Sequence, residues 1–213
     1  MVTILNALLV FVLLLNLFVL GTSRIRSLIQ AVALQGVALG VMPLLVHGRL
    51  TVLAGFVAIA TVLLKGSIIP QILFKALRDV QIKREIEPLI GFMPSTLLGA
   101  LGTAAAIGLS TKLPLAGGHA HTLVVPAALS TVFTGFILLT SRIKAITQAI
   151  GYLVLENGIF IFGLLLMEAV PFLVELGVLL DLFVGVFVIA IIIHHINREF
   201  ASLDTRRLSA LKE

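Results

Sequence analysis

Three charged side chains lie deep inside long apolar runs of the sequence. Lys65, Glu156 and Asp181 each stand well away from the polar segments that flank their runs. At about 1.5 Å rise per helical residue, these positions lie near the middle of a bilayer. A charge at that depth costs from about 2.5 to more than 10 kcal/mol, so such residues face a protein interior, a hydrated cavity or another subunit.

Carboxyl groups and a lysine at this depth suit proton transfer. Removal from water disfavours the charged form of both kinds of group, so they exchange protons closer to neutral pH than they do in water. We therefore predict that Lys65, Glu156 and Asp181 transfer protons. The alternative is that Glu156 or Asp181 pairs with Lys65 only to hold helices together. Two carboxylates and one lysine leave one carboxylate over, which favours the relay.

Further polar residues extend from these charges towards one end of their helices. Gln148, Tyr152 and Glu156 are spaced at i, i+4 and i+8, so they share one helical face that could order water. Tyr152 could equally be a packing residue. Asp181 and His195 also share a face, and His195 could exchange protons at the mouth of a path. The alternative for His195 is a helix cap.

Pro70 affects the backbone next to Lys65. Its ring removes the hydrogen bond to the carbonyl group four residues earlier, at Gly66. We expect a kink or a π-bulge beside Lys65, with room for a polar cavity. The alternative is an ordinary proline kink, with the Lys65 ammonium reaching to the bilayer surface.

The elements that carry these residues are predicted to be membrane helices. The chain is 60% hydrophobic and 12% charged, with a mean hydropathy of +1.20. Soluble domains are about half apolar and a quarter charged, so the excess apolar surface faces lipid. Seven runs reach the length of about 20 residues that a span needs: 2–21, 26–46, 51–76, 89–110, 122–140, 144–167 and 170–195. We predict an all-α polytopic protein, its first run being a mature helix and not a cleaved signal.

Basic residues predict the orientation of these helices. Loops one, three and five and the C-terminal tail hold 12 Lys and Arg residues, whereas the opposite loops hold only Arg49 and Lys112. The positive-inside rule then places the N-terminus outside and the C-terminus in the cytoplasm of the cell (inner) membrane. Because the basic residues fall in short loops, they indicate orientation and not nucleic-acid binding.

An internal repeat predicts the domain organisation. Thr22–Ala31 and Thr140–Ala149 are identical at six of ten positions, at an offset of 118 residues. The two copies run in the same direction, which indicates two parallel three-helix repeats joined by a connecting helix. We divide the chain into a first repeat (1–76), a connecting segment with its loops (77–121), a second three-helix unit (122–196) and a cytoplasmic tail (197–213). Convergence of two basic loops is the alternative.

Motifs of catalysis and metal binding are absent from the sequence. It has no cysteine, and it contains no phosphate loop, no H-E-x-x-H and no nucleophile elbow. His119 and His121 are only a weak metal signal. We expect a non-catalytic subunit without a cofactor of its own.

The segment Gly151-Tyr-Leu-Val-Leu-Glu-Asn-Gly-Ile-Phe-Ile-Phe-Gly163 resembles the E component of hydrogenase-4-type complexes, a family of membrane subunits of group 4 [NiFe] hydrogenases and formate hydrogenlyases. Residues 122–196 also resemble the K subunit of respiratory complex I and the C subunit of Mrp-type antiporters. That resemblance implies proton-path acids at Glu156 and Asp181, the second being an aspartate where the family has a glutamate. Lys65 has no counterpart in the three-helix subunits.

The resemblance implies an accessory subunit that transfers protons laterally between antiporter-like membrane subunits. The NiFe and iron–sulfur centres are then expected in partner subunits. Two alternatives remain: a subunit of a multisubunit Na⁺/H⁺ antiporter, and a scaffold whose buried charges only join helices. The sequence leaves open the transported ion, the electron donor, the exact partners and whether Lys65 is relay or structural.

Overall fold

The computed structural model describes residues 2–46, 52–80, 88–112 and 123–166. All of their regular elements are helices. These are α1 (Val2–Gly21), α2 (Ile25–Val46), α3 (Val52–Leu63), the π-helical turn η1 (Leu64–Ile68), α4 (Ile69–Val80), α5 (Phe92–Ser110), α6 (Val124–Ser141) and α7 (Ala145–Leu166). The predicted all-α class is therefore confirmed for the part of the chain that the structure describes.

Six helical stretches within the described residues are long and apolar enough to cross a membrane. One of them runs from Ala58 to Arg78, because α3, η1 and α4 form one continuous rod. These stretches correspond to the first six apolar runs of the sequence. The seventh, 170–195, lies outside the described residues, so a total of seven spans stays a prediction. The protein is a multi-pass membrane protein.

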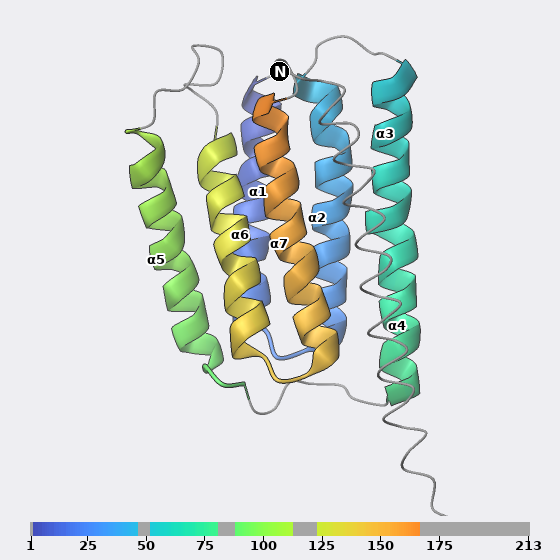
Figure 1. Ribbon diagram of the computed structural model, residues 1–213, viewed down its shortest axis with the longest axis vertical. Coiled ribbons are helices and arrows are strands. Elements are labelled where there is room, and N and C mark those ends of the chain that lie inside the picture. The colour runs from blue at the N-terminus through green and yellow to red at the C-terminus, as the bar shows by residue number, and fades with distance from the viewer. Residues whose placement is uncertain (1, 47–51, 81–87, 113–122, 167–213) are drawn as a thin grey trace, which may run out of the picture.

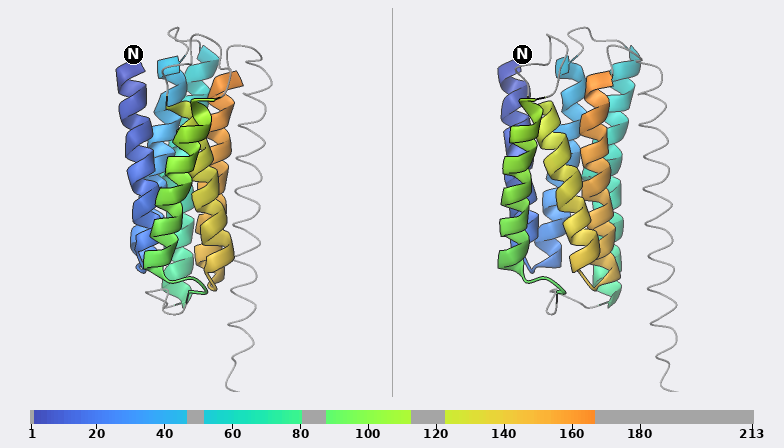
Figure 2. Two further views of the ribbon diagram at one scale, coloured as in Figure 1. Left: turned by 90° about the vertical axis from the view of Figure 1, so that its left-hand side faces the viewer. Right: turned by 60° about the vertical axis from the view of Figure 1, so that its left-hand side comes forward.

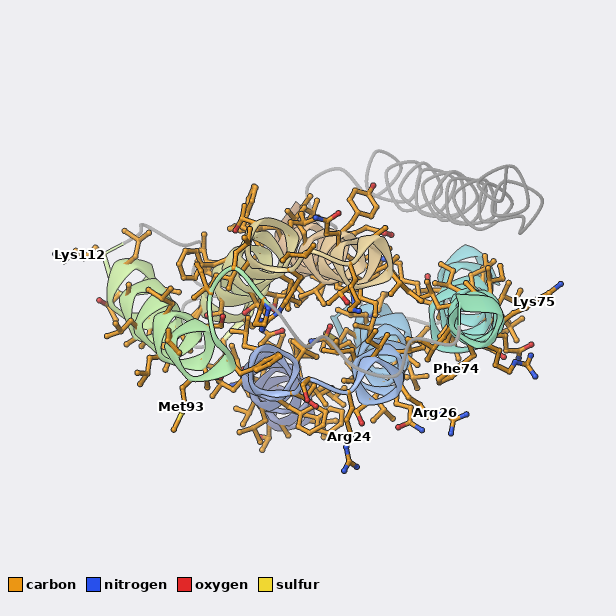
Figure 3. The ribbon with its side chains drawn as sticks, turned by 90° about the horizontal axis from the view of Figure 1, so that it is seen from below. Arg24, Arg26, Phe74, Lys75, Met93 and Lys112 are labelled. Carbon is orange, nitrogen blue, oxygen red and sulfur yellow. The ribbon has the colours of Figure 1, made fainter. Side chains whose placement is uncertain are left out.

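The helices stand nearly parallel, as Figures 1 and 2 show. Helices α1 and α2 form one layer and pack against α6 and α7, with α1 contacting α6 and α2 contacting α7. Seen along the helix axes in Figure 3, α5 flanks one end of these two layers and the α3–α4 rod flanks the other. The four central helices therefore bury the residues between the layers, while α5 and the rod leave much of their surface to lipid.

The central pair α6 and α7 pack closely because glycine occupies their contact. A β-carbon added at Gly135 would lie 2.5 Å from the backbone nitrogen of Leu155 on α7, a distance that no real side chain tolerates. Small residues of this kind let membrane helices approach each other closely. The position of α7, which carries Glu156, is thus fixed by its contact with α6.

The interior contains two apolar clusters with polar residues between them. The cluster nearer the short loops includes Leu20, Ile25 and Ile150, and the cluster at the other end includes Leu9 and Leu39. Between the two lie buried polar side chains from all four central helices and from η1: Asn16, Gln35, Lys65, Ser130, Thr131, Thr134, Glu156 and Asn157. The bundle therefore has a polar layer at mid-height, which we call the polar layer below.

Arg142 fixes the loop end of the bundle. It is 1% exposed, and its guanidinium group donates to the carbonyl oxygens of Leu20 (2.9 Å) and Ile90 (3.2 Å). The guanidinium also stacks over the Phe92 ring, with 4.5 Å to the centroid. Leu20 lies in the last turn of α1, where carbonyl groups lack helical partners and attract a cation. One side chain therefore ties together α1, α6 and the start of α5.

The arrangement of α1–α2 and α6–α7 agrees with the predicted repeat, but the described residues do not include all of its helices. In Figure 1, the loops at 22–24 and 142–144 lie at the same end of the bundle, and α6–α7 run beside α1–α2 in the same directions. The third member of the second repeat, 170–195, and the tail at 197–213 lie outside the described residues. The repeat, the domain bounds and the side of the membrane on which each loop lies remain predictions.

Candidate functional site

Lys65 lies in a π-bulge within the membrane-spanning rod. The turn η1 covers Leu64–Ile68, and the backbone N–H of Ile69 donates to the carbonyl oxygen of Leu64, five residues earlier. The π-bulge predicted from Pro70 is thus confirmed. Such bulges are frequent at functional sites. The Lys65 side chain is buried and points into the polar layer, so the alternative, in which its ammonium group reaches the bilayer surface, is wrong.

Lys65 forms an ion pair with Glu156. Its Nζ lies 2.7 Å from Oε1 of Glu156, and the two side chains are 6% and 1% exposed. The ammonium group also lies over the Phe160 ring, 5.4 Å from its centroid. Within the described residues, neither oxygen of Glu156 accepts a hydrogen bond of good geometry. The ion pair is therefore the main compensation for this buried carboxylate, and Oε2 is left to interact with a further group.

Gly36 allows the lysine to stand where it does. A β-carbon on Gly36 would lie 2.6 Å from the Lys65 β-carbon and 2.9 Å from its carbonyl carbon. Helix α2 therefore touches η1 backbone to backbone at this point. The contact fixes the base of the Lys65 side chain and directs its ammonium group towards α7.

A chain of side-chain hydrogen bonds extends from Lys65 across the bundle. All of its links donate in the same direction, away from the ammonium group. Lys65 Nζ donates to Asn157 Oδ1 (3.3 Å), Asn157 Nδ2 to Gln35 Oε1 (3.3 Å), Gln35 Nε2 to Asn16 Oδ1 (2.8 Å), and Asn16 Nδ2 to Thr131 Oγ1 (2.8 Å). Each amide thus turns its oxygen towards the Lys65 side. Aligned bonds of this kind strengthen one another in a low dielectric and stabilise a positive charge.

The other predicted site residues fall into two groups. Gln148 and Tyr152 are half-buried on α7, but the Gln148 amide donates to the carbonyl oxygen of Arg142 (2.9 Å) and so is used to close the turn before α7. Asp181 and His195 lie outside the described residues. Only Lys65 and Glu156 of the predicted charges are therefore brought together in the part of the chain that the structure describes.

The sequence reasoning missed the amides of the polar layer. Three amide side chains, those of Asn16, Gln35 and Asn157, interrupt apolar runs of the sequence. A polar residue in such a run indicates a position inside the bundle, but only residues with a formal charge were predicted as mid-membrane site residues. The buried role of Arg142 was missed too, because the residue was counted only as a basic loop residue. Arg24, the residue at the same position in the first repeat, is exposed, so the repeat does not predict that Arg142 is buried.

The described residues contain no group of three or more His, Cys, Asp or Glu side chains that could hold a metal ion. The described part of the polar layer brings one pair of titratable groups into contact, the Lys65 ammonium group and the Glu156 carboxylate.

Comparisons with known proteins give relatives that match most of this chain. The chain is 31% identical over 194 residues to the uncharacterized protein Rv0085 of Mycobacterium tuberculosis, covering 89% of this chain and 87% of the relative. It is also 31% identical over 150 residues to hydrogenase-4 component E of Escherichia coli, covering 70% of this chain and 68% of the relative. Hydrogenase-4 component E of Shigella flexneri matches equally well. No family model and no solved structure matches the chain.

Proposed function

The chain belongs to the hydrogenase-4 component E family, and from this membership we propose that it is a membrane subunit of a hydrogenase-type complex in which Lys65 and Glu156 transfer protons laterally. The observation that carries the proposal is the buried 2.7 Å pair between these two side chains in the polar layer. The subunit has no redox chemistry of its own in this proposal. The NiFe and iron–sulfur centres belong to partner subunits.

The proposed step uses both sides of the Glu156 carboxyl group. Lys65 delivers its proton to Oε1, which lies within hydrogen-bond distance of the ammonium nitrogen. Rotation of the protonated carboxyl group then carries this O–H to the position of Oε2, which has no hydrogen-bond partner among the described residues, and the proton passes from there to the next group of the path. Asp181 is the proposed next group, on the basis of its predicted depth in the membrane. Neutral Lys65 then takes a new proton from the antiporter-like neighbour on its other side.

The amide chain positions the Lys65 ammonium group and carries no protons in this proposal. Side-chain amides are neutral donors and acceptors. Oδ1 of Asn157 accepts from the ammonium group at 3.3 Å, and Gln35 and Asn16 hold the Asn157 amide in that orientation. The placement of the Lys65 ammonium group therefore depends on these amides as well as on Glu156.

The ion pair also favours a second function, that of a scaffold. A buried pair that joins the α3–α4 rod to α7 positions two parts of the bundle, whether or not a proton moves. In that case the complex needs the charges for assembly only. The two functions differ in what a neutral, isosteric replacement of Glu156 does.

The test is Glu156→Gln in the complete membrane complex. We expect normal co-purification of the partner subunits but loss of proton uptake, measured with a pH-sensitive dye in vesicles while hydrogenase turnover is followed. The matched control is Ser130→Ala, a buried polar-layer residue whose hydroxyl oxygen has no hydrogen-bond partner in the described part of the chain. Unchanged proton uptake with normal assembly contradicts the relay, and loss of assembly supports the scaffold. Repeating the assay with and without Na⁺ identifies the ion.

A further inference from the structure

A groove opens on the outer face of the bundle between α2 and the α3–α4 rod. Its volume is about 480 Å³. It is open to the surface, and its wall includes Gly66 and Ser67, which follow Lys65 in the π-bulge, but neither Lys65 nor Glu156. Two of its wall residues on α2, Leu34 and Val37, are 50% and 40% exposed. The groove is therefore a lipid-facing site distinct from the polar layer.

The α2 wall of the groove changes in polarity along its length. On α2, the wall runs through Val37, Leu34 and Gln30, which share one helical face. One further turn towards the loop end, the same face carries Arg26, which is exposed. The α2 wall is therefore apolar at mid-membrane, amide-bearing below that, and cationic at the membrane surface.

The wall on the rod differs in its order, because Ser67 and Gln71 are followed by Phe74 before the wall reaches a basic residue. Ser67, Gln71 and Phe74 line the groove, and the Gln71 amide donates to the Ser67 hydroxyl at 2.9 Å. One turn beyond Phe74 on the same face is the exposed residue Arg78, with exposed Lys75 beside it. In Figure 3, Arg26 and Phe74 lie on the side of the bundle where α2 faces α4, and Arg24 lies nearer α1. Both walls thus end in arginine at the same end of the bundle.

We propose that this groove binds one anionic phospholipid of the adjoining leaflet. Its phosphate group pairs with Arg26 and Arg78, and its ester groups meet the Gln30 and Gln71 amides. One acyl chain lies along Leu34 and Val37 towards the π-bulge. Arginine forms two parallel hydrogen bonds to a phosphate group, and basic sites between membrane helices bind anionic headgroups in this way.

Charge and polarity favour a phospholipid over the helix of a partner subunit as the occupant. A partner helix would have to present polar side chains at the depth of Gln30 and Gln71 and an acidic group beside both arginines at the membrane surface. A phospholipid has an apolar chain, polar esters and a negative phosphate in that order, which is the order of groups along the α2 wall. The exposed Gln30 amide also needs a hydrogen-bond partner that a plain hydrocarbon surface does not provide.

The experiment titrates the full-length protein, purified with its co-migrating subunits in detergent, with phosphatidylglycerol and with phosphatidylcholine of the same acyl chains. Native mass spectrometry counts the bound lipid. We expect phosphatidylglycerol to bind about tenfold or more tightly than phosphatidylcholine, because the choline cation of phosphatidylcholine neutralises its phosphate and is repelled by the two arginines. The double variant R26Q/R78Q should remove this preference, while Arg24→Gln, outside the groove at the same membrane end, should keep it.

A second pair of variants tests the acyl-chain part of the groove. Leu34→Trp fills the groove and should weaken phosphatidylglycerol binding, whereas Leu14→Trp, on an exposed position of α1, should not. Equal binding of both lipids by the unmodified protein overturns the proposal, as does equal phosphatidylglycerol binding by R26Q/R78Q and Arg24→Gln. A partner helix in the groove would give no such site in any variant, which also overturns it. Glu156→Gln leaves the groove intact, so failure of the proton relay and failure of this site are distinguishable.

Discussion

Nζ of Lys65 lies 2.7 Å from Oε1 of Glu156, in a layer of polar side chains between two apolar clusters. The two residues are 91 positions apart in the sequence and belong to different helices of the bundle. Their contact depends on a π-bulge in one helix and on a glycine in a third. The predictions below test how the bundle holds this pair and what the pair does.

The ion pair should show strong coupling in a double-mutant cycle. Lys65→Met should lower the free energy of unfolding by about 3–5 kcal/mol, because it leaves a buried carboxylate without its partner, whereas Glu156→Gln keeps an oxygen that accepts from the ammonium group and should cost less. The double variant should be more stable than the sum of the two losses implies. Unfolding in mixed micelles, followed by circular dichroism, measures all four proteins. Additivity within about 0.5 kcal/mol would contradict direct coupling.

Replacing the lysine by arginine separates charge from proton transfer. Arginine keeps the positive charge but does not lose its proton in proteins, so Lys65→Arg should preserve assembly of the complex and stop proton uptake. The matched control is Lys75→Arg on α4, an exposed position outside the polar layer, which should leave both unchanged. Vesicle proton uptake and co-purification are the measurements. Full proton uptake in Lys65→Arg would exclude Lys65 as a relay group.

Gly36 should not tolerate a side chain. Gly36→Ala places a β-carbon 2.6 Å from that of Lys65, so we expect a loss of about 1–3 kcal/mol from overpacking and a displaced ammonium group. Gly108→Ala on α5 is the control, because nothing lies within 4 Å of its added β-carbon. It should be neutral or stabilising by up to about 1 kcal/mol. If the two variants unfold alike, the close contact of α2 with η1 is wrong.

Asn16, at the far end of the amide chain from Lys65, should affect both the stability of the bundle and proton uptake. Asn16→Leu removes the acceptor of the Gln35 amide and the donor to Thr131, and unpaired polar groups in a membrane bundle cost about 0.5–2 kcal/mol each. We also expect proton uptake to slow, because the amides no longer hold Asn157 Oδ1 against the Lys65 ammonium group. Ser130→Ala serves as the control. An unchanged rate of proton uptake in Asn16→Leu would show that the amides only pack helices.

Arg142 and its repeat partner Arg24 should differ sharply. Arg142→Gln loses two hydrogen bonds to backbone carbonyl groups and the stacking on Phe92, so we expect about 2–4 kcal/mol of destabilisation. Arg24→Gln, at an exposed position, should change the free energy of unfolding by less than about 0.5 kcal/mol. The measurement is unfolding in mixed micelles. Equal effects would mean that the sequence repeat, and not the burial of Arg142, governs these loops.

The apolar runs of the sequence predict the helices, because backbone N–H and C=O groups in lipid must form hydrogen bonds within their own membrane-spanning segment. This requirement acts locally, so six spans and the π-bulge near Pro70 follow from the sequence without knowledge of the packing. The presence of Lys65 and Glu156 at mid-depth follows in the same way. The seventh span, with Asp181 and His195, lies outside the described residues, so its existence and the depth of these two side chains are still predictions from the sequence.

The partners of the buried charges were decided by the tertiary structure alone. Helical periodicity gives the depth and the face of a side chain, but it does not say which helix that face meets. Glycine contacts such as Gly36 on Lys65 and Gly135 on Leu155 set the neighbours, and these join residues far apart in the chain. The sequence by itself therefore determined that charges lie in the membrane, and only the packing of α2, α7 and the rod determined that Lys65 faces Glu156 and Asn157.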